Sequence, residues 1–117
     1  MTITIYHNPR CSKSRATLEI IQSKGITPNI VEYLHTPPDP DTLEKIARLI
    51  GVPLGELLRR NEDDFVAAGD DVPLDDETAL ARWLHDHPRV LERPIVVDDD
   101  NDRAIVGRPP NNVNAIL

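Results

Sequence analysis

The fold class is decided by residues 2–34, which read TITIYHNPRCSKSRATLEIIQSKGITPNIVEYL. Residues 2–6 alternate β-branched side chains and predict a strand, and residues 30–34 predict a second strand. Between them the apolar period lengthens to that of a helix, which starts near Ser12 and which Gly25 ends. A strand, a helix and a strand in so short a stretch form a βαβ unit, so we expect the two strands to be parallel.

The middle of the chain predicts helices. Asp39 is placed to cap a helix whose first residue is Pro40. Residues 54–60 predict a short helix, and residues 61–76 an acidic, irregular segment. Residues 80–87 predict one more helix, which stops before a proline. The helical faces consist of Leu43, Ile46, Ala47 and Ile50, and of Leu80, Trp83, Leu84 and His87.

The last part of the chain predicts β-structure again. Residues 94–97 and 103–106 favour two strands of a hairpin with the acidic tip Asp98–Asp102, and residues 112–117 a short closing helix. This is the element order of a thioredoxin-like α/β fold, in which helices pack on a mixed four-stranded sheet. We expect a single domain over residues 1–117, with a helical insertion between its βαβ and ββα halves.

Length and composition set the outer bounds. The chain has 117 residues, of which 39% are hydrophobic and 28% charged, as in globular domains. No apolar run approaches the roughly 18 residues that a membrane helix needs. Residues 1–6 lack the basic region and the long apolar stretch of a signal peptide. We therefore expect a cytoplasmic protein that does not bind membranes.

The distribution of charge bears on partners. The net charge is −7, which argues against nucleic acid, because its binding depends on neutralised phosphates. Residues 1–25 nevertheless carry only one acid, Glu19, against four bases. Three of these bases, Arg10, Lys13 and Arg15, flank the predicted helix N-terminus, where the helix dipole disfavours cations. They imply a compensating thiolate or a bound oxyanion.

Cys11 is the only cysteine and the candidate nucleophile. A single cysteine excludes an internal disulfide, a Cys-x-x-Cys couple and a zinc site built on several thiolates. A phosphatase-type Cys-x5-Arg loop needs arginine where this chain has Thr17, and a dithiol oxidoreductase needs cysteine in place of Ser14. A helix N-terminus lowers the pKa of a thiol, so the sequence predicts an acidic monothiol. The alternative is a buried, inert cysteine.

Two possible metal motifs are set aside. His85 and His87 are two residues apart, so on a helix they point to different sides. Asp98–Asp102 has the spacing that opens a calcium loop, but Arg103 and Pro109 stand where that loop needs glycine and glutamate. No metal site is expected.

Residues 7–15, His-Asn-Pro-Arg-Cys-Ser-Lys-Ser-Arg, resemble the glutaredoxin-dependent arsenate reductase (ArsC) family, whose fold is thioredoxin-like. Four further blocks resemble it in the same order: YLHTPP at 33–38, LLRRN at 57–61, ERPIVV at 92–97 and GRP at 107–109. The chain ends soon after the last block and is similar to a shorter branch of the family.

The resemblance implies a reaction and a site. In that family a cysteine attacks arsenate, glutathione attacks the adduct, and glutaredoxin removes the glutathione, which leads to release of arsenite. Glutathione is then a co-substrate, glutaredoxin a partner, and no cofactor is bound. By resemblance Cys11 is the nucleophile, His7 tunes its thiol, and Ser14 is the hydroxyl beside it. The arginines that hold the oxyanion correspond to Arg59, Arg93 and Arg108, and Pro94 to a cis-proline facing the cysteine.

Two other functions stay open at the level of sequence. One is a monothiol reductase of another substrate. The other is an interaction or regulatory protein without turnover, similar to the Spx-type regulators that share the fold. Ser14 argues against the Cys-x-x-Cys switch that those regulators often carry, though not against a binding role.

Overall fold

The computed structural model describes residues 1–117. They form two compact units. The sheet unit consists of Met1–Thr36 and Arg93–Leu117, and the helical unit of Pro37–Glu92. The single domain over residues 1–117 stays a prediction.

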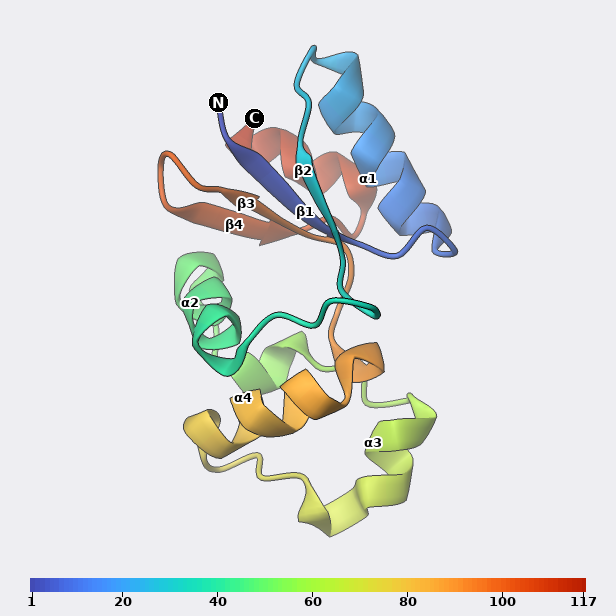
Figure 1. The fold of residues 1–117 in the computed structure, drawn as a ribbon, viewed down its shortest axis with the longest axis vertical. Helices are drawn as coiled ribbons and strands as arrows, with labels where there is room; N and C mark the ends of the chain where they lie inside the picture. Colours follow the sequence, from blue (N-terminus) through green and yellow to red (C-terminus); the bar gives the residue numbers. More distant parts are fainter. The chain divides into compact units, whose positions relative to one another are not determined.

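The sheet unit contains all four strands (Figure 1). The strands are β1 (Ile3–His7), β2 (Asn29–Glu32), β3 (Ile95–Asp98) and β4 (Arg103–Val106), in the order β2-β1-β3-β4. β1 is parallel to β2 and antiparallel to β3, and β3 forms an antiparallel hairpin with β4. The sheet is therefore mixed, and the thioredoxin-like α/β class is confirmed.

One face of the sheet is covered by α1 (Ser12–Ser23) and the C-terminal 3-10 helix η4 (Pro110–Ile116), which lie side by side in Figure 1. Alternation along β1 and helical spacing along α1 bring apolar side chains together there. The core consists of Ile3, Ile5, Ile21, Val96, Val113 and Ile116. The closing helix begins two residues earlier than the sequence predicts and is 3-10 rather than α-helical.

The helical unit contains α2 (Pro40–Ile50) and α4 (Glu77–Asp86), which pack against each other. Both helices are capped by an aspartate at the N-terminus: Asp39 accepts a hydrogen bond from the amide of Thr42, as predicted, and Asp76 from that of Ala79. The unit also contains the 3-10 helices η1 (Leu54–Leu57) and η3 (Pro88–Val90). The predicted helix at 54–60 is thus only η1, because Leu58 is extended and bridges to Leu91.

The prediction of an irregular segment at 61–76 is wrong in part. This segment contains α3 (Asp63–Ala68), followed by η2 (Gly69–Asp71). Two aspartates in the first turn of α3 interact favourably with the helix dipole. Phe65 packs edge-on against Trp83, with 6.5 Å between the ring centroids. The helix has six residues, none of them buried, so it leaves no apolar period in the sequence.

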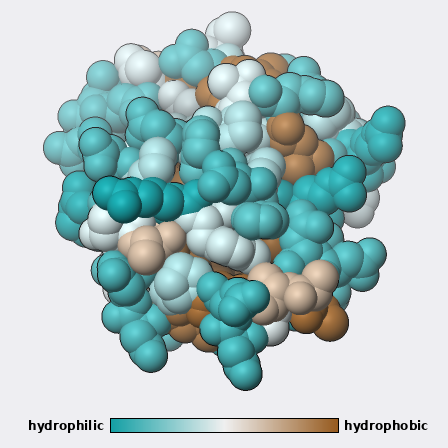
Figure 2. Space-filling model, turned by 60° about the horizontal axis from the view of Figure 1, so that its bottom comes forward, coloured by the Kyte–Doolittle hydropathy of each residue, from teal (hydrophilic) through white to brown (hydrophobic).

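Few large hydrophobic side chains are exposed. They are Met1, Ile30, Val66 and Leu74. The face of the molecule seen in Figure 2 is hydrophilic over most of its area. None of the helices has the length and apolar character required to span a bilayer.

Candidate active site

Cys11 lies in the turn between β1 and α1, as its N-cap residue. Its backbone is extended, with φ −93° and ψ 123°, its amide donates to the carbonyl of Asn8 at 3.0 Å, and its carbonyl accepts from the amide of Arg15 at 3.0 Å. The side chain of Asn8 closes the same turn by accepting from the amide of Arg10 at 3.0 Å. The thiol is thereby held beside the free amides of the first helical turn.

His7 and Ser14 meet beneath this turn. His7 continues the buried alternation of Ile3 and Ile5 along β1, and Ser14 lies on the buried face of α1. The Nδ1 atom of His7 is 2.6 Å from the Oγ atom of Ser14, which also accepts from the amide of Asn8 at 3.1 Å. The hydroxyl of Ser14 thus holds the His7 ring and the turn.

The pKa of His7 is lowered. Burial lowers it most, the nearby carboxylate of Glu32 raises it, and the guanidinium of Arg15 lowers it further. The imidazole is therefore neutral at pH 7. Arg15 is itself fixed on the turn, since its Nη1 atom donates to the carbonyl of Pro9 at 2.9 Å.

The pKa of the Cys11 thiol is also lowered. Burial alone raises it, but the backbone amides of Ser14 and Lys13 and the side chain of Arg93 outweigh that effect. The first two contributions follow from the place of the thiol at the helix N-terminus. The third comes from a residue far along the chain.

Arg93 and Arg108 reach the thiol because of strand pairing. β1 runs antiparallel to β3, so the turn that follows β1 lies beside the start of β3, which Arg93 precedes. β3 runs antiparallel to β4, so Arg108, which follows β4, arrives there as well. The Nη1 atom of Arg108 is 3.2 Å from the carbonyl oxygen of Arg93 and 4.0 Å from the sulfur of Cys11. The peptide bonds Arg93–Pro94 and Arg108–Pro109 are both cis, the first as the family resemblance implies.

This arrangement suits a tetrahedral oxyanion. The Nε atom of Arg93 is buried and makes no hydrogen bond within the protein. An oxyanion at the thiol offers acceptor oxygens to such a donor, and two guanidinium groups offset the repulsion between the anion and a thiolate.

Arg59 belongs to the helical unit. Its side chain is 17% exposed and forms ion pairs with Glu62 and, at 3.7 Å, with Glu92. Its amide donates to the carbonyl of Val90. The role of Arg59 as an oxyanion ligand stays a prediction.

The histidines and aspartates set aside above have structural partners. The Nδ1 atoms of His85 and His87 each lie 2.8 Å from a backbone carbonyl oxygen, and the His87 ring stacks on Trp83. Asp98 is fully buried and accepts from Asn101 at 2.9 Å and from Arg103 at 3.0 Å. These contacts stabilise a helix end and the hairpin tip.

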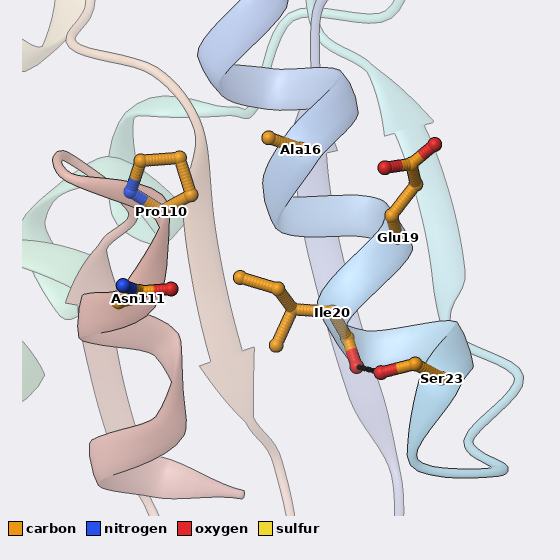
Figure 3. Close-up of a pocket in the computed structure, with 6 residues that line it drawn as sticks. All are labelled: Ala16, Glu19, Ile20, Ser23, Pro110 and Asn111. Carbon is orange, nitrogen blue, oxygen red and sulfur yellow. Dashed lines mark hydrogen bonds between the residues drawn. The ribbon is translucent and has the colours of Figure 1, made fainter.

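A groove of about 420 Å³ lies between α1 and η4 (Figure 3). No residue of the predicted site lines it, and Ser23 donates a hydrogen bond to the carbonyl of Ile20 along one wall. Its lining residues are Ala16, Glu19, Ile20, Ser23, Pro110 and Asn111. The groove is separate from the thiol and has no part in the site.

Sequence reasoning missed Asn8 as an organiser of the turn. The signal was present, since asparagine before Pro9 is typical of a turn that its side chain closes. From the sequence, the cations expected to act on the thiol were its neighbours Arg10, Lys13 and Arg15. In the structure the arginines that come close to the thiol are instead Arg93, which lowers its pKa, and Arg108, whose guanidinium lies 4.0 Å from the sulfur.

Comparison with known proteins gives one family. A model of the ArsC family matches residues 6–116, which include every site residue named above. A protein named arsenate reductase from Neisseria meningitidis serogroup A is 46% identical over 98% of this chain and 97% of its own length. The uncharacterized protein YfgD of Escherichia coli is 43% identical over 98% of this chain and 96% of its own length. The solved structure of a putative arsenate reductase from Yersinia pestis superposes with a TM-score of 0.89 at 42% identity, covering 97% of this chain and 99% of that one.

Proposed function

The chain belongs to the ArsC family, and on that premise we propose that it reduces arsenate to arsenite, with Cys11 as nucleophile and glutathione and glutaredoxin as reductants. We further propose that it works in the cytoplasm, where both reductants are found, and that it needs no bound cofactor or metal.

One observation carries the proposal: a monothiol of lowered pKa lies 4.0 Å from the guanidinium of Arg108. A thiolate is the reactive form of cysteine, and a cation is required to bring a second anion to it. The buried, inert cysteine considered above does not account for a thiol that is partly exposed and faces two arginines.

The proposed reaction reduces arsenic by two electrons, which two thiols supply. The Cys11 thiolate forms a bond to arsenic(V), and one arsenate oxygen leaves as water after protonation. Glutathione adds to the arsenic in the same way and displaces a second oxygen. A glutaredoxin thiol then attacks the glutathione sulfur and forms a mixed disulfide with it. The bond between arsenic and that sulfur breaks, and its electron pair stays on arsenic. Two thiols are thus oxidised, arsenic(V) becomes arsenic(III), and hydrolysis releases arsenite and free Cys11.

Each predicted site residue has a role in this scheme. Arg93 and Arg108 bind the oxyanion and stabilise the thiolate. His7, neutral and held by Ser14, packs beneath the turn that carries the thiol. Arg59 supplies a third guanidinium group, which requires that it exchange Glu62 or Glu92 for the oxyanion.

The test measures arsenite formed from arsenate by the purified protein with glutathione, glutaredoxin and a system that reduces them. We expect turnover that requires both thiol reagents and that is abolished in Cys11→Ser. Arsenite formation at the normal rate by the Cys11→Ser protein contradicts the mechanism. Absence of turnover with a rapidly alkylated thiol near pH 7 indicates a reductase of another substrate, and absence of turnover with a sluggish thiol indicates an interaction protein.

A further inference from the structure

Gly107 is buried between the end of β4 and α1, at a point where no side chain fits. A Cβ atom at this position meets Thr17 Oγ1 at 2.6 Å, Pro94 Cγ at 2.9 Å and Thr17 Cγ2 at 3.0 Å. Its φ is not among the positive values that other glycines of this chain adopt. Glycine is therefore required for space and not for an unusual backbone conformation.

This close contact is tied to the position of Arg108. The amide of Gly107 donates to the carbonyl of Pro94 at 2.9 Å, which fixes the chain between the two arginines. Arg108 follows at once, and its guanidinium reaches the carbonyl of Arg93 and the sulfur of Cys11. The carbonyl of Arg108 is held from its other side by the Nδ2 atom of Asn112 at 3.0 Å. A displacement at residue 107 is therefore passed directly to Arg108.

Thr17 is the matching residue on α1. It is fully buried, and its hydroxyl donates to the carbonyl of Lys13 at 2.8 Å and lies 3.4 Å from the carbonyl of Gly107. Thr17 stands six residues after Cys11, where a Cys-x5-Arg loop has its arginine. In this chain the position holds Thr17, and the cation near the thiol is Arg108, which follows the residue that packs against Thr17.

We propose that Gly107 and Thr17 are positioning residues for Arg108: their close packing lets the end of β4 pass against α1 and sets the guanidinium 4.0 Å from the Cys11 sulfur. The inference rests on the proposed function only for its effect on arsenate turnover. Its effect on the thiol is independent of substrate.

The test is Gly107→Ala, read out as the pH midpoint of Cys11 alkylation by iodoacetamide. The new methyl group has to withdraw from Thr17 Oγ1 by about 0.8 Å to reach ordinary contact, which begins at 3.4 Å. If Arg108 withdraws equally, the midpoint rises by about 0.1 to 0.5 pH unit, because charge interaction falls inversely with distance. Arg108→Met removes the charge completely and so gives the largest shift of the midpoint expected from Arg108. Arsenate turnover falls by up to about 100-fold, as for a comparable misplacement of a positioning group.

The matched control is Gly55→Ala. A Cβ atom at Gly55 meets its neighbours only at 3.8 Å and 4.0 Å, which is ordinary contact, so the midpoint of this variant should equal that of the wild type. The double variant Gly107→Ala/Thr17→Ala removes two of the three close contacts. Its midpoint should return toward the wild-type value.

The outcomes separate the two proposals. A folded Gly107→Ala protein with the wild-type midpoint overturns the inference. If that variant does not fold, the double variant decides: a folded protein with a midpoint near wild type supports the inference, and an unfolded one overturns it. A shifted midpoint in Gly107→Ala, in an enzyme whose wild type makes no arsenite, leaves the inference standing and overturns the proposed function.

Discussion

Replacing Arg108 with Met should raise the pKa of Cys11 and slow its reaction near pH 7. Methionine keeps most of the length and apolar character of the arginine stem and removes its charge and hydrogen bonds. The Arg108 guanidinium lies 4.0 Å from the sulfur, so it favours the thiolate over the neutral thiol.

The size of the effect follows from the distance. Two unit charges about 4 Å apart interact by about 1 kcal/mol in water and by about 4 kcal/mol near a protein surface. Since one pKa unit corresponds to about 1.4 kcal/mol, removing the charge raises the pKa by about 0.7 to 3 units. Cys11 is partly exposed, so solvent and salt screen the pair, and we expect a rise of about one unit.

The assay is the rate of iodoacetamide alkylation as a function of pH, since only the thiolate reacts. Arg108→Lys keeps the charge without the planar fork and should give an intermediate midpoint. Arg82→Met is a matched control, because Arg82 is an exposed arginine and is not among the groups that shift the pKa of the thiol. Its midpoint should not move.

Salt supplies a second check on the cause. A change from low to about 1 M ionic strength screens the pair, so it should raise the wild-type midpoint more than that of Arg108→Met. The electrostatic explanation fails if Arg108→Met titrates within about 0.2 unit of the wild type. It also fails if the Lys and Met variants coincide, because charge then has no effect.

Three further predictions concern Arg93, His7 and Asp76. Arg93→Ala should raise the KM for arsenate and the alkylation midpoint together, because Arg93 lowers the pKa of the thiol; a changed kcat with neither shift speaks against this role. The folded-state pKa of His7 is lowered, so the unfolded chain binds the proton first on acidification, and the free energy of unfolding should fall as pH drops below about 6.5. The dependence of this free energy on pH, measured by urea denaturation between about pH 7 and pH 5, should be weaker in His7→Gln. An unchanged dependence means that a group other than His7 causes it. Asp76→Ala removes the cap of α4 and should cost about 1 kcal/mol in urea denaturation, whereas Asp76→Asn should cost much less; equal losses in both contradict the capping role.

Several features of this protein follow from the sequence because they depend on residues close together in the chain. Alternation in residues 2–6 and helical spacing after Ser12 give β1 and α1, and Asp39 before Pro40 gives the start of α2. The position of Cys11 at a helix N-terminus is of the same kind. Each is a matter of backbone periodicity and capping within a few residues.

Other features lack a local pattern. α3 is too short to show an apolar period, and it packs through one ring, Phe65, on a residue of another helix. The resemblance of sequence blocks assigned Arg59, Arg93 and Arg108 equal roles, although Arg59 is ion-paired with two glutamates and the other two lie at the ends of β3 and β4.

Local sequence pattern is enough to place one thiol at the start of a helix that follows a strand. The charges that act on that thiol depend instead on contacts between distant parts of the chain. The register of β1 with β3 and of β3 with β4 brings Arg93 and Arg108 to the Cys11 thiol. Because Gly107 has no side chain, the chain before Arg108 can pack closely against Thr17 of α1. Strand pairing and close packing join residues far apart in the chain, and no periodicity of neighbouring residues records such contacts.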